Sequence, residues 1–238
     1  MISGRRTALL VGLALSLVGA LSATARAQMI EASAPPAFRP PQWEVSAGVR
    51  TMYIKSAGYD PFSTNDGFVQ FSLSGLGVIA RRDRLSFAVG VGLDVGGSSA
   101  TARNAPSSLT LTHLSALAEG RYQPWSRLYL FARVAPGMVH GTATIDDASS
   151  PASSGLTTDF DAFSLDASGG AAFCLGAVGM ARVGVWLLAD GGYGWVAAQD
   201  LVLAPSLSAA DQSKAGTLDL GTIAPRGGFF RISLALSY

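Results

Sequence analysis

The stretch FFRISLALSY, residues 229–238, alternates between two kinds of side chain. Phe230, Ile232, Leu234, Leu236 and Tyr238 are apolar or aromatic, whereas positions 231, 233, 235 and 237 hold one arginine and three small residues. A period of two places alternate side chains on opposite faces of a β-strand. The stretch therefore predicts a strand with one apolar face that runs to the last residue. Chain ends fray in water and expose the side chains that they carry, so this apolar face must be covered by something other than water.

The beginning of the chain predicts a secretory signal peptide. MISGRR carries positive charge, TALLVGLALSLVGALSA is apolar, and Ala25-Arg26-Ala27 has the small residues of a cleavage site. We expect residues 1–27 to be removed, and residues 28–42 to form a proline-rich periplasmic leader. Removing three arginines leaves 14 of the 17 basic residues against 16 acidic ones, a net charge of −2. No basic excess therefore indicates nucleic acid as a partner.

The composition favours a membrane protein without spanning helices. Only 14% of the residues are charged, 28 are glycine, and the mean hydropathy is positive. After the signal peptide no uninterrupted apolar stretch is long enough for a spanning helix. Lipid cannot satisfy open backbone groups, so the remaining spanning structure is a closed β-barrel. Cys174 is the only cysteine, which excludes an intrachain disulfide and predicts a small packing residue.

Alternation predicts eight strands, most of them about as long as the 9 to 11 residues that a tilted strand needs to cross a bilayer. They are residues 43–53, 67–80, 84–95, 109–122, 127–139, 162–175, 181–195 and 227–238. The predicted fold is an all-β, transmembrane, antiparallel up-and-down β-barrel over residues 43–238. Apolar residues at 201–203 and 218–220 indicate that the last two strands continue as a hairpin. The alternative is an extra strand pair, which would make ten strands.

The predicted connections alternate in length. Those at 81–83, 123–126 and 176–180 are short, whereas those at 54–66, 96–108, 140–161 and 196–226 are long and polar. Short periplasmic turns and longer outside loops are typical of bacterial outer-membrane barrels. With an even number of strands both ends lie in the periplasm, so the four long connections are predicted to be extracellular.

The segment pattern carries a family resemblance. Residues 117–137, LAEGRYQPWSRLYLFARVAPG, together with FFRISLALSY, resemble the small eight-stranded bacterial outer-membrane β-barrel superfamily of the OmpA, OmpX and OmpW kind. The resemblance covers residues 43–238, and it implies a place in the outer membrane among lipid and lipopolysaccharide. It also implies that the terminal strand is a signal for the barrel-assembly machinery, through Phe230, Ile232, Leu234, Leu236 and Tyr238. It implies no single activity.

Aromatic residues support a membrane-spanning barrel independently. Three predicted strands carry aromatic pairs eight or ten residues apart on the apolar face: Trp43 and Tyr53, Phe163 and Phe173, Phe230 and Tyr238. Such a pair spans about 20 to 25 Å along the membrane normal, the height between two aromatic girdles. Tyr193 and Trp195 would join the outer girdle and Tyr122 the inner one. A soluble barrel such as a lipocalin would need a polar outer face.

The opposite face of the predicted strands carries balanced charges. The candidate lumen network is Glu44, Arg50, Asp94, Glu119, Arg121, Arg133, Asp166, Arg182, Asp190 and Arg231. Counting from the strand ends places one set at a common height: Arg50, Arg231, Asp94, Asp166 and Asp190. Glu44, Glu119, Arg121 and Arg182 are predicted to lie lower. An eight-stranded interior is only wide enough for side chains, so we expect paired charges that plug the lumen. The alternative is an ion pathway or a proton relay.

Catalysis is not expected. His113-Leu-Ser115 loosely resembles the His-x-Ser motif of lipid A deacylases, but Ala116 follows where those enzymes carry Asn. His113 and Ser115 share parity with Glu119, which points them into the lumen. His140 could approach His113 near the outer rim, yet two histidines are weak evidence for a metal. We predict no metal and no cofactor.

The sequence therefore predicts an outer-membrane barrel with a structural or surface-interaction role, acting through four extracellular loops around a charge-plugged lumen. Its extracellular ligand, if it has one, is not named by the sequence. The alternative function is a narrow channel for small or apolar solutes, as in the OmpW-like branch. A lipid-modifying enzyme is the less favoured third reading.

Overall fold

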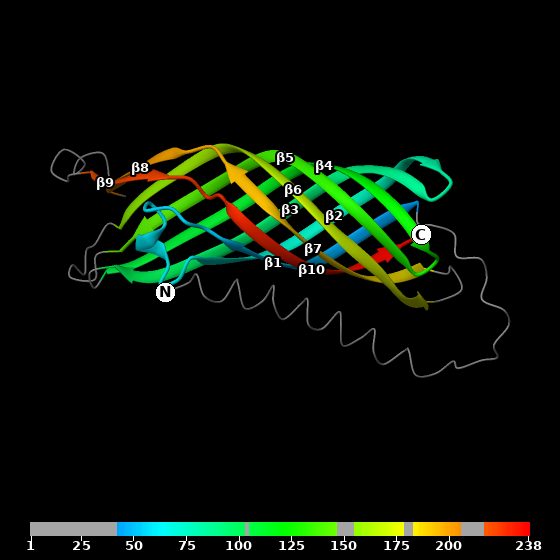
Figure 1. Ribbon diagram of the computed structural model, residues 1–238. Coiled ribbons are helices and arrows are strands. Elements are labelled where there is room, and N and C mark those ends of the chain that lie inside the picture. Colours follow the sequence, from blue (N-terminus) through cyan, green and yellow to red (C-terminus); the bar gives the residue numbers. More distant parts are fainter. Residues whose placement is uncertain (1–41, 103–104, 147–154, 179–182, 206–216) are drawn as a thin grey trace. The chain divides into compact units, whose positions relative to one another are not determined.

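The computed structural model describes residues 42–102, 105–146, 155–178, 183–205 and 217–238. These residues form ten β-strands and one short 3-10 helix, η1 (Asp60–Phe62), as Figure 1 shows. The strands are β1 (Trp43–Tyr53), β2 (Gly67–Arg82), β3 (Leu85–Ala102), β4 (Ala105–Trp125), β5 (Leu128–Ile145), β6 (Leu156–Val178), β7 (Val183–Val196), β8 (Gln199–Pro205), β9 (Leu218–Ile223) and β10 (Gly227–Ser237). Among the described residues, no helix has the length and apolar character needed to cross a membrane.

Eight of these ten described strands close into an antiparallel ring. Their order is β1-β2-β3-β4-β5-β6-β7-β10, and β10 pairs with β1 to complete the barrel. The closing pair runs from Glu44 opposite Ser237 to Met52 opposite Phe229. Trp43 and Tyr238 exchange two backbone hydrogen bonds of 2.9 Å, so the last strand is paired to its end. The predicted eight-stranded barrel is confirmed.

The two remaining strands continue the ring as a hairpin. β8 follows β7 and pairs with the start of β6, where Thr157 lies opposite Ala204. β9 pairs with β8 and leads directly into β10. The predicted hairpin extension is therefore confirmed, and it adds no strand to the ring.

Two predicted long loops are largely strand. β3 continues to Ala102 and β4 begins at Ala105, so the prediction of a loop over 96–108 is wrong for most of its length. β5 continues to Ile145 and β6 begins at Leu156, which likewise shortens the predicted loop over 140–161. These segments are rich in Ser, Thr and Asp, which is typical of loops, but continuous pairing with the neighbouring strands satisfies their backbone groups.

The barrel has two distinct ends. The terminal end holds Trp43 and Tyr238 together with the tight turns after β2 and β4; the loop end is the opposite one. Asp83, in the turn after β2, has a φ of 51°, a left-handed conformation that Asp tolerates better than most residues. The predictions for residues 1–41, the signal peptide and nearly all of the leader, lie outside the described residues.

The two faces of the strands match the predicted alternation. In β10, Phe230, Ile232, Leu234 and Leu236 are exposed on the outer surface, whereas Arg231 and Ser233 are buried inside. The predicted girdle aromatics are exposed on the outside, at Trp43, Tyr53, Tyr122, Phe163, Phe173, Tyr193, Trp195, Phe230 and Tyr238. A closed sheet with an apolar outer face has its favourable environment in lipid.

The outer surface changes character toward the loop end. Leu114 and Met138 are exposed, and the outward positions beyond them are Thr112 and Thr110 on β4 and His140 and Thr142 on β5. The apolar belt therefore ends near Leu114, and β3 to β6 continue past it as a polar wall.

Candidate functional site

The interior of the ring is the candidate site because it gathers the buried charges. The described members of the predicted lumen network are all buried there: Glu44, Arg50, Asp94, Glu119, Arg121, Arg133, Asp166, Asp190 and Arg231. Arg182 lies outside the described residues. Inward positions on β1 read Glu44, Ser46, Gly48, Arg50 and Met52 from the terminal end to the loop end, which sets the heights of the layers described below.

The loop-end charge layer consists of Arg50, Asp94, His113, Asp166, Asp190 and Arg231. Arg50 Nη1 lies 2.8 Å from a carboxylate oxygen of Asp94 and 2.8 Å from one of Asp166. Arg231 donates two hydrogen bonds to Asp190, at 3.1 and 2.9 Å. The guanidinium of Arg50 also stacks on the ring of Phe229, 4.1 Å from its centroid. The five charged residues predicted to share one height are thus brought together.

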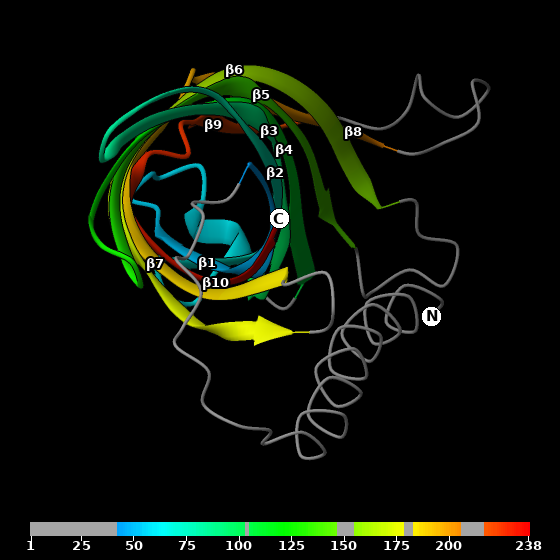
Figure 2. The same cartoon turned by 90° about the vertical axis from the view of Figure 1, so that its right-hand side faces the viewer.

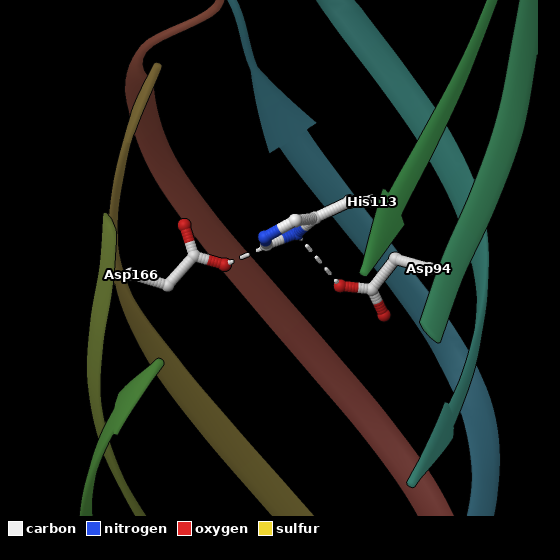
Figure 3. Close-up of side chains that lie close together, drawn as sticks. All are labelled: Asp94, His113 and Asp166. Carbon is white, nitrogen blue, oxygen red and sulfur yellow. Dashed lines mark ion pairs between the residues drawn. The ribbon is translucent and has the colours of Figure 1, made fainter. Parts of the chain in front are cut away.

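His113 completes this layer, as Figure 3 shows, and sequence analysis did not assign it there. Its Nδ1 lies 3.5 Å from Asp94 Oδ2 and 3.8 Å from Asp166 Oδ2. On the other side of the imidazole ring, Nε2 lies 2.8 Å from the hydroxyl of Ser164, a fully buried residue. The inward parity of His113 was visible in the sequence, but its height against Asp94 depends on the register of β3 with β4.

The donor atoms of Asp94, His113 and Asp166 lie within 4.8 Å of one another, a spacing that can hold a metal ion. However, Arg50 Nη1 already contacts Oδ2 of both carboxylates. A metal ion bound to these oxygens would lie against a guanidinium of the same charge sign. The position for a cation between the two acids is therefore taken by Arg50, and the set does not fit a metal while Arg50 is in place.

The terminal-end charge layer consists of Glu44, Glu119, Arg121, Arg133 and Tyr129. Arg121 lies 3.2 Å from Glu44 and 2.5 Å from Glu119. Arg133 Nε donates to Glu119 at 2.7 Å, and the Tyr129 hydroxyl donates to Glu44 at 2.7 Å. The guanidinium of Arg121 lies 4.8 Å from the centroid of the Tyr129 ring. Two carboxylates thus face two guanidiniums, with Tyr129 as an additional partner that sequence analysis missed.

An aromatic pair closes the terminal end next to this layer. Trp186 is fully buried, and its indole N–H donates to Ser237 at 2.8 Å. Its ring lies 5.2 Å from that of Tyr129, centroid to centroid. Between the two charge layers, the hydroxyls of Ser46 and Ser74 hydrogen-bond at 2.7 Å.

An apolar cork closes the loop end. Residues 54–66, which connect β1 to β2, fold inward, so that Figure 2 shows η1 inside the ring of strands. Ser98 and Ser107 donate hydrogen bonds from the β3–β4 wall to the carbonyls of Phe62 and Pro61. We name as the cork the buried apolar residues gathered here, chiefly Ile54, Tyr59, Phe62, Phe68, Leu109, Leu111, Leu201, Leu203, Ile223 and Phe229.

The prediction that residues 54–66 form an outward loop is wrong. Three of its side chains, Ile54, Tyr59 and Phe62, are at most 1% exposed. Large apolar residues in a connecting segment are a signal that the segment packs on something, and here the open end of the barrel is the available apolar surface. Between the cork and the loop-end charge layer lies a cavity of about 20 Å³, bordered by Gln70, His113 and Asp166.

His140 does not join His113. It lies on the outer surface of β5, where its Nδ1 is 3.0 Å from Asp161, whereas His113 points inward from β4. The expectation that the two approach each other is wrong because Thr112, not His113, lies opposite His140, and the two histidines have opposite parity. Cys174 is buried and points inward, in keeping with a packing residue.

Fold and interior together define the class of protein. A closed antiparallel barrel with an even number of strands, an apolar outer belt between aromatic girdles and a polar inside is the architecture of outer-membrane proteins. The chain has the fold of an integral outer-membrane β-barrel protein.

Comparison with known proteins adds three structures of the same kind. The chain is similar to Neisserial surface protein A (13% identity, 83% of this chain and 97% of that one, TM-score 0.46). It is similar to Ail, the attachment invasion locus protein of Yersinia pestis (12% identity, 84% and 100%, TM-score 0.46). It is also similar to the outer membrane protease OmpT from Escherichia coli (7% identity, 87% and 99%, TM-score 0.47). Similarity at this level says nothing about activity. No protein-family model and no curated protein sequence matches the chain.

Proposed function

We propose that this protein is a sealed outer-membrane barrel with a structural or surface-interaction role, and that it neither conducts solutes nor catalyses a reaction. The observation that carries the proposal is the series of side-chain layers that lie across the interior. From the terminal end the lumen contains the Trp186 and Tyr129 rings, the terminal-end charge layer, the loop-end charge layer and the cork. The terminal strand, Phe230 to Tyr238, serves as the signal for the barrel-assembly machinery in this proposal.

The small volume of the cavity beside His113 argues against the alternative function, a narrow channel. The cavity above His113 has a volume of about 20 Å³. That is roughly enough for one water molecule, which needs about 10 to 15 Å³. The ion pairs in both charge layers also hold the side chains of the lumen in place.

The same argument weighs against catalysis. Ser164, His113 and Asp94 stand in the order of a nucleophile, a base and an orienting acid. However, the Ser164 side chain is fully buried, and the cavity of about 20 Å³ beside His113 has no room for an acyl substrate. In this arrangement the Ser164 hydroxyl is the hydrogen-bond partner of His113 Nε2.

The polar wall at the loop end supports a surface-interaction role. In the proposed orientation the terminal end faces the periplasm, so the wall of β3 to β6 projects outside the cell. Its outward side chains include Ser99, Thr110, Thr142, Asp159 and Asp161. Strand pairing holds these side chains in fixed rows, for example through the 2.7 Å hydrogen bond from Thr142 to Asp159. Lipopolysaccharide and extracellular ligands are the partners that this wall can reach.

Conductance in planar lipid bilayers tests the sealed barrel. The purified protein is expected to give no steady conductance, because the two charge layers and the cork lie across the lumen. A matched variant in which Tyr59 and Phe62 are both replaced by Ser, loosening the cork, should still be closed, since the two charge layers remain. A large and reproducible open conductance of the unmodified protein would contradict the proposal and favour the channel.

A further inference from the structure

The segments that follow β1 and precede β10 run side by side at the loop end. β1 and β10 form the antiparallel pair that closes the barrel. Beyond that pair, Gly227 lies so close to the carbonyl oxygen of Tyr53 that a Cβ added there would overlap it. Further along, the backbone N–H of Ala224 donates to the hydroxyl of Ser56 at 3.3 Å. The two segments therefore stay in contact past the ends of both strands.

Two basic residues, Lys55 and Arg226, lie between these two contacts, one on each segment. We name them the cationic pair. The register that places Met52 opposite Phe229 places Lys55 opposite Arg226 when it is continued. Both are exposed, and the outward face of β1 ends with Tyr53, two residues before Lys55. The cationic pair therefore lies on the outer surface, just beyond the aromatic girdle of the loop end.

The two positive charges of the cationic pair are not neutralised by their described neighbours. Like charges in directly opposed positions repel each other and destabilise strand pairing. Among the residues that the structure describes, neither Lys55 nor Arg226 forms an ion pair. The nearby acid Asp66 hydrogen-bonds through its side chain to Tyr53 instead. The cationic pair is therefore suited to an anion that the described part of the chain does not supply.

Aromatic residues lie beside the cationic pair. On β10, Gly228 lies opposite Tyr193 of β7, and the same register continued by two residues places Arg226 opposite Trp195. Tyr53, Tyr193 and Trp195 are all exposed on the outside. Tyr and Trp of membrane barrels lie at the interface between hydrocarbon and headgroups. The cationic pair therefore lies at the level of the lipid headgroups.

We propose that the cationic pair binds a phosphate of lipid A, the membrane-embedded part of lipopolysaccharide, and that a sugar ring of lipid A packs on the neighbouring aromatic side chains. An ammonium and a guanidinium side by side bind phosphate oxygens through charge-assisted hydrogen bonds. Aromatic rings pack against the apolar faces of sugars. A phosphorylated sugar matches both features, whereas phosphatidylglycerol offers a phosphate without a ring. The inference rests on the proposed function, in which the loop end faces the leaflet that contains lipopolysaccharide.

Native mass spectrometry of the purified protein in a non-ionic detergent tests the site. The protein is offered equal amounts of lipid A with both phosphates and the same lipid A without phosphates. We expect stronger retention of the phosphorylated form, by about fivefold for each of the two positive charges, the usual size of the attraction of one basic residue to anionic lipid. The Lys55→Gln/Arg226→Gln variant should retain both forms equally.

A matched double variant, Arg82→Gln/Arg84→Gln, removes two exposed positive charges from the terminal end and should keep the preference. In a second competition, against phosphatidylglycerol, phosphorylated lipid A should again be retained more strongly.

Equal retention of the two forms of lipid A by the unmodified protein would overturn the inference, as would an undiminished preference in the Lys55→Gln/Arg226→Gln variant. Equal retention of phosphatidylglycerol and lipid A would overturn the choice of lipid A as the ligand. These outcomes are independent of the sealed lumen, which the conductance measurement tests separately.

Discussion

The stability of the two charge layers in the lumen depends on how individual side chains are paired. In the terminal-end charge layer two carboxylates face two arginines, whereas in the loop-end layer Asp94, Asp166 and Asp190 face only Arg50 and Arg231. His113 lies where a further donor is needed, between Asp94 and Asp166. A buried polar group without a partner is costly, so the stability of this layer depends on His113 and Ser164 as well as on the arginine–aspartate pairs.

The first prediction concerns the two histidines. His113→Leu should destabilise the barrel by about 1 to 3 kcal/mol, because it leaves the buried Ser164 hydroxyl and the Asp94 carboxylate each without one partner. His140→Leu, on the outer surface, should change stability by less than about 0.5 kcal/mol. Urea unfolding of both variants in lipid vesicles measures the difference. Equal effects would mean that His113 does not support the layer.

The second prediction concerns Arg231 and Asp190, which pair across β10 and β7. Arg231→Ala should cost about 3 to 5 kcal/mol if no water reaches the site, because Asp190 stays buried without its partner. Replacing both residues by Leu should restore most of the stability, since no unpaired charge is left. The same unfolding measurement compares the single and double variants. A double variant as unstable as Arg231→Ala would argue that the pair is not the source of the loss.

At the scale of single elements, the strands differ in what surrounds them. β10 has Phe230, Ile232, Leu234 and Leu236 on its outer face, inside the apolar belt, and is paired on both edges by β1 and β7. β9 lies on the hairpin beyond the belt and pairs with β8. Leu236 is therefore exposed on β10 inside the belt, whereas Leu218 is exposed on β9 beyond it.

The third prediction compares these two strands. Leu236→Asp should reduce the amount of folded barrel in the outer membrane, because a charge on the lipid face costs up to a few kcal/mol depending on its depth. It also changes the proposed assembly signal. Leu218→Asp on β9 should leave the yield unchanged. Heat-modifiable mobility in gel electrophoresis of outer-membrane fractions reports the folded barrel. Normal yields for Leu236→Asp would speak against a lipid-facing terminal strand.

At the scale of the whole molecule, the described strands close into one barrel whose two ends differ. The terminal end has tight turns and exposed arginines, whereas the loop end has the polar wall and the cork. The β8–β9 hairpin also lies at the loop end (Figure 1). This asymmetry is the basis of the proposed orientation, in which the loop end faces the outside of the cell.

The fourth prediction tests that orientation. In a Cys174→Ala background, Ser99→Cys on the polar wall should react with an impermeant thiol reagent on intact cells. Asp83→Cys, in the turn after β2, should react only after the outer membrane is permeabilised. The reverse pattern would mean that the loop end faces the periplasm.

The sequence by itself determined the fold class, the eight strands of the ring and the face of almost every strand residue. The physical reason is that a strand has a period of two, and that lipid and a narrow lumen demand opposite kinds of side chain on its two faces. The heights of Arg50 and Arg231 followed from simple counting, since β1 and β10 begin and end together.

Only the tertiary structure decided which groups touch. His113 meets Asp94 and Ser164 through the registers and curvature of β3, β4 and β6, which lie far apart in sequence. The inward fold of residues 54–66 and the strand character of residues 96–102 depend on surfaces supplied by other strands. Local composition does not predict these contacts. Backbone hydrogen bonding and apolar burial can be satisfied by whichever strand the closed barrel brings close.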